Sequence, residues 1–180
     1  MACALLTAGV CRAQHVTAET AVTKNSRIVM SEAMRMIIGG CQYSFSLEAG
    51  GCCADQSWYL VVDAPYNISK AQTVTFMLGN GRRMVLVAET ADSLVAKRQP
   101  VRLYGKKTRS NIYRYRYKLE GDRLDALTGI PVRNIRIDNP VSWSETDLDS
   151  SDSESLMTFL DKARKEVIKG RQTLTAHVTE

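Results

Sequence analysis

The strongest chemical pattern in the sequence is a basic segment in which cationic side chains alternate with tyrosines. Between residues 97 and 118 the chain carries nine lysines and arginines and no acidic residue. The residues that we expect to form a cationic surface are Arg102, Lys106, Lys107, Arg109, Arg114, Arg116 and Lys118. Such a row of cations binds anionic polymers, and interleaved aromatic rings would also allow stacking with the bases of single-stranded nucleic acid.

The spacing of the tyrosines decides between these two ligands. Tyr113, Tyr115 and Tyr117 are separated by single basic residues. In a strand, this alternation places the rings on one face and the cations on the other. Rings and charges then do not share one groove, so nucleic acid is disfavoured as a partner and an anionic polymer remains an alternative.

A segment of the opposite charge lies further along the chain. From Glu145 to Glu154 there are five acidic residues and no basic one. The net charge of +5 is ordinary for a soluble surface and does not by itself indicate a nucleic-acid partner. Attraction between the two charged segments within the fold explains them at least as well as a polyanion surface. The acidic segment does not match an EF-hand, because Asp152 stands where glycine is required.

The sequence contains no catalytic or cofactor signature. Its only histidines, His15 and His177, lie near the two ends, so neither a histidine-based triad nor a multi-histidine metal site is expected. There is no P-loop and no dinucleotide fingerprint, and no cofactor is predicted. A hydrolase that uses paired carboxylates remains an alternative, with Asp55, Asp63 and Glu89 as lone candidates.

The first residues have features of a secretory leader. Residues 1–13 are mostly small and apolar and end in a small-x-small pattern before Gln14, although no basic residue precedes the apolar run. We interpret them as the remnant of a signal peptide, which predicts a periplasmic or secreted protein. A lipid anchor at Cys11 is the weaker alternative, because Val10 is a poor residue before a lipidated cysteine. No apolar run approaches the length of about 18 residues that a membrane-spanning helix needs.

The cysteines beyond the leader suggest a disulfide. In an oxidising compartment, two of the three are expected to pair. Adjacent cysteines rarely bond to each other, because their Cα atoms are too close for relaxed disulfide geometry. Cys41 is therefore predicted to pair with either Cys52 or Cys53. A redox or metal role for the adjacent pair is the weaker alternative, since there is no CxxC spacing.

Alternating apolar residues predict an α+β fold that is mainly antiparallel β, arranged as a sandwich or a rolled sheet. Asn80–Gly81 between two β-rich segments predicts a tight hairpin, and residues 88–100 are expected to form a polar connection. A short internal helix is expected between Asp122, as its N-cap, and Gly129.

The domain boundaries follow the composition of the chain. We expect a β-rich domain over residues 14–138, an acidic Ser/Asp linker over 139–153, a C-terminal helix over 154–170 and a polar tail over 171–180. Ser151 and Glu154 match a capping box at the start of this helix. The apolar stripe of the helix consists of Leu156, Leu160, Ala163 and Val167.

The order of features from Trp58 to Ile137 is distinctive. It comprises an aromatic-apolar strand at residues 58–62, Ile-Ser-Lys at 68–70, the Asn-Gly hairpin, a Tyr-rich strand at 113–117, a short helix at 123–127 and a closing strand at 132–137. This order, together with the Ala13–Gln14 leader end, resembles uncharacterised exported β-rich proteins of Bacteroidota. The resemblance implies a secreted β-rich domain and carries no catalytic residues.

These observations favour an exported, non-enzymatic β-domain that binds a protein or envelope component through its sheet or its basic face. One alternative is a carboxylate-dependent hydrolase acting on a cell-envelope or dietary polymer. The other is polyanion binding by the basic block, residues 97–118. The sequence leaves the oligomeric state open.

Overall fold

Alternating apolar residues build the centre of the sheet. The structure is a computed structural model that describes residues 22–23, 26–50, 57–65, 73–138 and 143–176. In strand β5 (Cys41–Gly50), the side chains of Tyr43, Phe45 and Leu47 are at most 1% exposed. Their spacing of two residues places all three on the face of the strand that forms the core.

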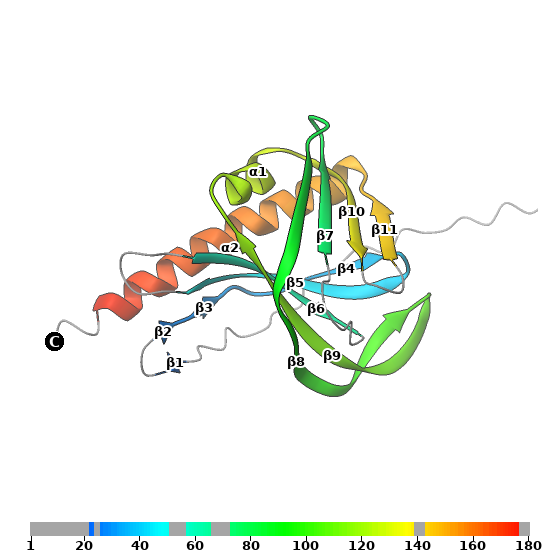
Figure 1. Ribbon diagram of the computed structural model, residues 1–180, viewed down its shortest axis with the longest axis horizontal. Helices are drawn as coiled ribbons and strands as arrows, with labels where there is room; N and C mark the ends of the chain where they lie inside the picture. Colours follow the sequence, from blue (N-terminus) through cyan, green and yellow to red (C-terminus); the bar gives the residue numbers. More distant parts are fainter. Residues whose placement is uncertain (1–21, 24–25, 51–56, 66–72, 139–142, 177–180) are drawn as a thin grey trace, which may run out of the picture.

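Nine strands of the described chain form one antiparallel sheet, which is rolled rather than flat (Figure 1). Its order is β11 (Trp143–Asp147), β10 (Val132–Asp138), β7 (Thr73–Leu78), β8 (Arg83–Leu103), β9 (Lys106–Leu119), β6 (Ser57–Ala64), β5 and β3 (Val29–Met30), with β4 (Met34–Ile38) also paired to β5. A separate ladder joins β1 (Val22–Thr23) and β2 (Ser26–Arg27). The predicted α+β fold class, mainly antiparallel β, is confirmed.

The predicted hairpin at Asn80–Gly81 is confirmed as the turn between β7 and β8. Gly81 has a φ of +82°, and its N–H donates to the carbonyl of Leu78 at 2.9 Å. The side-chain oxygen of Asn80 accepts a hydrogen bond from the N–H of Arg82 at 3.0 Å. Asparagine and glycine therefore have the roles in this turn that their chemistry predicts.

Strand β8 belongs to both halves of the sheet. Its first part, residues 83–87, pairs with β7, and the rest pairs with β9 through four register shifts. Its last residue, Leu103, pairs with Cys41, so that β5, β6, β9 and β8 close into a ring of paired strands. The predicted polar connection over residues 88–100 is wrong, because this segment continues β8. The segment lacks an alternating apolar pattern because its consecutive residues 97–100 are all exposed, so neither face of the strand is buried there.

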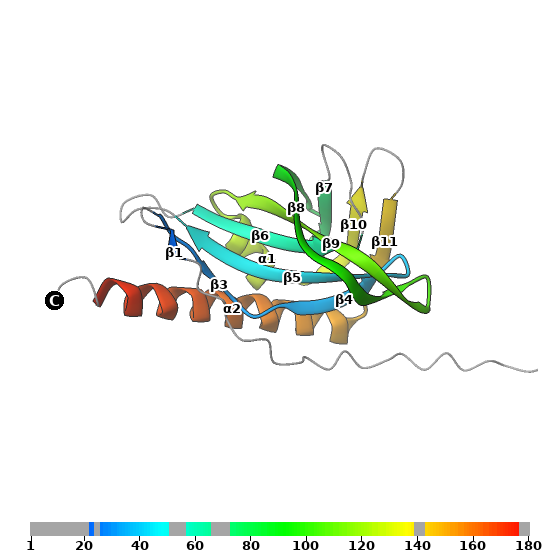
Figure 2. The ribbon, with the colours of Figure 1, turned by 90° about the horizontal axis from the view of Figure 1, so that it is seen from below.

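Two helices complete the described fold, α1 (Arg123–Gly129) and α2 (Ser150–Ala176). Helix α2 packs along the rolled sheet against β5 and β10 and also contacts α1 (Figure 2). The residues of its predicted apolar stripe are each at most 1% exposed. They are Leu156, Leu160, Ala163 and Val167. Each fully buried leucine or valine stabilises the fold by roughly 1.5–3 kcal/mol. Neither described helix combines the length and the apolar character needed to cross a membrane.

The predicted linker over residues 139–153 is wrong where the structure describes it. Residues 143–147 form β11, which pairs with five residues of β10. The Ser- and Asp-rich composition reflects the position of β11 at an end of the strand order, where Trp143 and Asp147 are exposed. The C-terminal helix is also longer than predicted, since α2 covers residues 150–176 rather than 154–170.

The predicted capping box of α2 is wrong, whereas Asp122 occupies the predicted N-cap position of α1. The carboxylate of Asp149 accepts a hydrogen bond from the N–H of Asp152 at 2.8 Å, so Asp149 caps α2 in place of the predicted box at Ser151. At α1, the side chain of Asp122 makes no capping hydrogen bond. It pairs instead with Arg82 at 3.0 Å, and this guanidinium lowers the pKa of Asp122.

Candidate functional site

Part of the β8–β9 hairpin extends beyond its neighbouring strands, and we call this segment, residues 94–112, the ribbon (Figure 1). Strand β7 pairs with β8 only as far as Val87, and β6 pairs with β9 only from Tyr113 onward. The two strands of the ribbon therefore pair mainly with each other, with one further pairing of Leu103 to Cys41. Bulges, lysines and prolines protect such open edges, which accounts for part of the ribbon's composition.

Four of the seven predicted cationic residues lie near the end of the ribbon. Arg102, Lys106, Lys107 and Arg109 are all exposed. Arg102 stands directly opposite Lys107, and Pro100 stands opposite Arg109, so three cations share one face of the ladder. No acidic side chain of the described chain pairs with any of the four. Like charges directly opposite each other destabilise a ladder, so these cations cost the fold free energy.

The fold neutralises the other predicted cations. Arg114 forms a bidentate ion pair with Asp63, which stands opposite it on β6, with N–O distances of 2.8 and 2.9 Å. Arg116 pairs with the buried carboxylate of Glu48, and its guanidinium carbon lies 4.2 Å from the centre of the Tyr59 ring. Arg114 links β9 to its neighbour β6, and Arg116 links β9 to β5 across β6, so both arginines have a structural role.

Lys118 is paired as well. Its ammonium lies 3.3 Å from the carboxylate of Glu120, and this hydrogen bond raises the pKa of Lys118. The seven predicted residues thus fall into two sets. The set on the ribbon is available to a partner, and the set from Arg114 onward is held by the fold.

The acidic segment does not neutralise the ribbon. Glu145 lies 3.7 Å from Arg136 and accepts a hydrogen bond from the side chain of Asn134 at 3.0 Å. Among the described residues, no ion pair joins the basic segment 97–118 to the acidic segment 145–154. The interpretation that these segments attract each other within one molecule is therefore wrong for the part of the chain that the structure describes.

The ribbon ends in a two-residue turn, Tyr104–Gly105. Both residues have a positive φ, +49° and +78°, as a type I′ turn requires. A tyrosine in this left-handed conformation costs roughly 1–2 kcal/mol, yet its side chain is 76% exposed. The N–H of Tyr104 donates to the carbonyl of Gly40 at 2.6 Å, and a hydrogen bond with the Cys41 thiol raises the pKa of Tyr104. At the tip, therefore, the backbone of Tyr104 is strained and its ring is exposed among cations.

The turn between β4 and β5 joins this tip to the start of β11 (Figure 1, Figure 2). A Cβ at Gly39, where φ is +55°, would lie 2.9 Å from the Cα of Ser144. Glycine is therefore required for the close approach of the two backbones. Trp143, the first residue of β11, is 60% exposed, and its ring centre lies 4.9 Å from the guanidinium carbon of Arg136.

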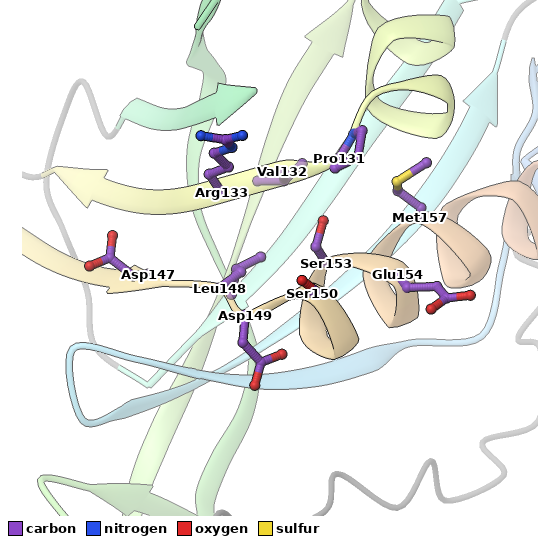
Figure 3. Close-up of a pocket in the computed structure, with 10 residues that line it drawn as sticks. All are labelled: Pro131, Val132, Arg133, Asp147, Leu148, Asp149, Ser150, Ser153, Glu154 and Met157. Carbon is purple, nitrogen blue, oxygen red and sulfur yellow. The ribbon is translucent and has the colours of Figure 1, made fainter. Parts of the chain in front are cut away.

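A cleft of about 900 Å³ opens where β10 begins, β11 ends and α2 begins (Figure 3). Its lining combines apolar residues with acidic ones near the mouth. The apolar residues are Pro131, Val132, Leu148 and Met157, and the acidic ones are Asp147, Asp149 and Glu154. Arg133 also borders the cleft, but its side chain points away from α2.

Ser153 places a hydroxyl inside this cleft. The residue is 5% exposed, and its Oγ has no hydrogen-bond partner within the described structure. Figure 3 shows the side chain pointing from α2 toward β10, into the space that the apolar residues line. A buried hydroxyl without a partner costs about 1–3 kcal/mol. A ligand that hydrogen-bonds to Ser153 would recover this free energy.

The carboxylates proposed for hydrolysis do not converge. Asp63 is held by Arg114, and Glu89 is an exposed residue on β8. Asp55 lies outside the described residues, as do His15 and His177. Within the described chain, no group of three or more His, Cys, Asp or Glu side chains could hold a metal ion.

Cys41 is a free and buried cysteine at the start of β5. Cys52 and Cys53 lie outside the described residues. The predicted disulfide between Cys41 and Cys52 or Cys53 therefore falls outside the described residues and stays a prediction.

Comparison of the chain with known protein families, curated proteins and solved structures gives no match. Sequence reasoning identified the ribbon cations but missed Tyr104 and the cleft. The Tyr-Gly dipeptide between two strand segments was the available signal for the tip, because glycine there indicates a tight turn. The cleft had no such signal, since its lining comes from three separate elements.

Proposed function

We propose that the chain is an exported, non-enzymatic binding protein whose ribbon binds an anionic surface of a protein or envelope component. The observation that carries the proposal is the exposed pair Arg102 and Lys107, which stand directly opposite each other without an acidic partner in the described chain. Repulsion between these two cations lowers the stability of the fold. A partner that supplies the missing negative charge explains why the pair is present. The leader pattern of residues 1–13 supports export.

The spacing of the cations supports an extended anionic partner over a single small anion. Cross-strand neighbours lie about 5 Å apart, and residues two apart along a strand lie about 7 Å apart. Arg102, Lys107 and Arg109 therefore form a fixed triangle on one face of the ladder. Several anionic groups on one chain or one surface contact all three at once, and the rigid ladder lowers the entropy lost on binding.

Retention on immobilised heparin as a function of salt tests the proposal. The variant Lys106→Glu with Lys107→Glu removes two ribbon cations, and we expect it to elute at lower salt than the wild type. The slope of log affinity against log salt should fall by about two, because two cations no longer displace counterions. The matched control is Arg82→Glu with Arg83→Glu, which makes the same change in charge where the β7–β8 turn enters β8.

The control separates a binding site from net charge. We expect the Arg82, Arg83 variant to retain most of the wild-type affinity and its salt slope. Equal loss of retention in both variants would show that heparin responds only to the overall charge of +5, and the proposal would be abandoned. Thermal unfolding of each variant, followed by circular dichroism, confirms that the comparison is made between folded proteins.

A further inference from the structure

The ribbon tip and the cleft have complementary surfaces, although they lie apart in one molecule. The tip carries the exposed ring of Tyr104 among cations, whereas the cleft has an apolar lining and an acidic mouth. The tip is held against Gly40, beside the start of β11, and the cleft lies at the other end of that strand. Five residues of strand span about 13 Å or more, so the tip does not fill the cleft of its own molecule.

We infer that the ribbon tip of one copy of this chain docks in the cleft of a second copy. The exposed face of the Tyr104 ring packs on Leu148 and Met157, while Lys107 and Arg102, which share one face of the ladder, face the acidic mouth. This inference rests on the proposed function, because it identifies the anionic surface that the ribbon binds as the cleft of another copy.

The apolar part of this contact is supported by the tip itself. Tyr104 is a large aromatic residue at a turn position that favours asparagine or glycine, and the fold leaves most of it in solvent. Tyrosine is among the residues that contribute most to binding at protein interfaces. A cleft of about 900 Å³ lies within the size range of sites that enclose a side chain or a small ligand.

The polar part of the contact is supported by groups in the cleft. The Oγ of Ser153 is buried without a partner and points into the cleft, where a lysine ammonium from the tip would donate to it. Glu154 and Asp147 are exposed at the mouth. They supply the negative charge that the ribbon lacks within its own molecule.

The arrangement also determines the form of the assembly. The tip and the cleft are different surfaces, so the contact is head-to-tail and the assembly grows with protein concentration. Each copy has a net charge of +5, so copies repel one another except where local charges are complementary. Because the docking contact itself joins opposite charges at short range, self-association is expected to be strongest at low salt and to weaken as salt screens the contact.

Sedimentation velocity of the full chain tests the inference through a charge exchange. One variant reverses the ribbon, with Lys106→Glu and Lys107→Glu, and the other reverses the cleft mouth, with Asp147→Lys and Glu154→Lys. Each variant alone is expected to self-associate at least about tenfold more weakly than the wild type, because like charges then face each other. An equimolar mixture is expected to associate again, because a basic ribbon meets an acidic cleft.

Two controls accompany the exchange. Reversal of Arg82 and Arg83 controls for the ribbon variant, and Glu89→Lys with Glu120→Lys controls for the cleft variant, since both acidic residues are exposed away from the cleft. Tyr104→Asn is a further variant that suits the turn and removes the ring, and it is expected to lose self-association. Its result decides the case if a charge-reversed variant fails to fold.

The outcomes separate the inference from the proposed function. A wild type that sediments as the 20.0 kDa monomer at every concentration in low salt overturns the inference. A mixture of folded variants that does not associate overturns it as well. If heparin retention still depends on Lys106 and Lys107 in either case, the ribbon binds another anionic partner and the proposed function stands. If that dependence is also absent, both are wrong.

Discussion

The two hairpins that share β8 differ in how the protein stabilises them. In the β7–β8 hairpin, Phe76 stands opposite Met84, and both side chains are buried. In the ribbon, Arg102 stands opposite Lys107, and both are exposed. One strand therefore begins as part of the core and ends as a cationic surface.

The turns of the two hairpins differ in the same way. The side chain of Asn80 accepts a hydrogen bond within its turn, and the N–H of Gly79 donates to the carbonyl of Pro131 at 2.6 Å. Tyr104 occupies a strained position and leaves its ring in solvent. One end of β8 thus has stabilising residues and the other has destabilising ones, which supports the proposal that the ribbon binds a partner.

Truncation of two leucines on β8 tests the difference in burial between the two hairpins. We expect it to give the largest change in the free energy of unfolding. Leu86 is fully buried, whereas Leu94 is 43% exposed on the ribbon. Leu86→Ala is expected to lower the free energy of unfolding by about 2–5 kcal/mol, because it leaves a cavity, and Leu94→Ala by less than about 1 kcal/mol. Urea denaturation of both variants measures this. Similar losses would mean that the ribbon is packed as tightly as the core.

Exchange of the turn residues Asn80 and Tyr104 should change the free energy of unfolding by an intermediate amount, with opposite sign in the two hairpins. Asn80→Tyr removes the hydrogen bond to Arg82 and should cost about 1 kcal/mol. Tyr104→Asn relieves the left-handed strain and should raise the free energy of unfolding by up to about 1 kcal/mol. Thermal denaturation distinguishes the two. Destabilisation by Tyr104→Asn would assign the ring a structural role and remove one argument for a partner.

A single charge reversal should give the smallest change in stability. Lys107→Glu places an acidic side chain opposite Arg102 and should stabilise the isolated protein by about 0.3 kcal/mol, while heparin retention falls. The midpoint of urea denaturation and the elution salt are measured on the same preparation. If stability and retention fell together, Lys107 would be part of the structural framework rather than of a binding surface.

Local patterns allowed much of the sheet to be predicted from the sequence. The Asn80–Gly81 turn and the buried stripe of α2 follow from φ preferences and from the 3.6-residue period, which depend on neighbouring residues alone. The prediction was wrong for residues 88–100 and for β11. In these segments polar side chains occur in strands that are exposed, and exposure depends on the position of a strand in the sheet.

The sequence by itself determined that nine cations follow one another without an acidic residue between 97 and 118. Only the tertiary structure decided which of them are free to bind. Arg114 is paired with Asp63, 51 residues away on the adjacent strand β6, and Arg116 with Glu48, 68 residues away on β5. The register of β9 with β6 and of β6 with β5 brings these residues together. In the ribbon, no ion pair joins Arg102, Lys106, Lys107 or Arg109 to an acidic side chain of the described chain. Charge follows from composition, but neutralisation depends on contacts that strand pairing makes across long separations in the chain.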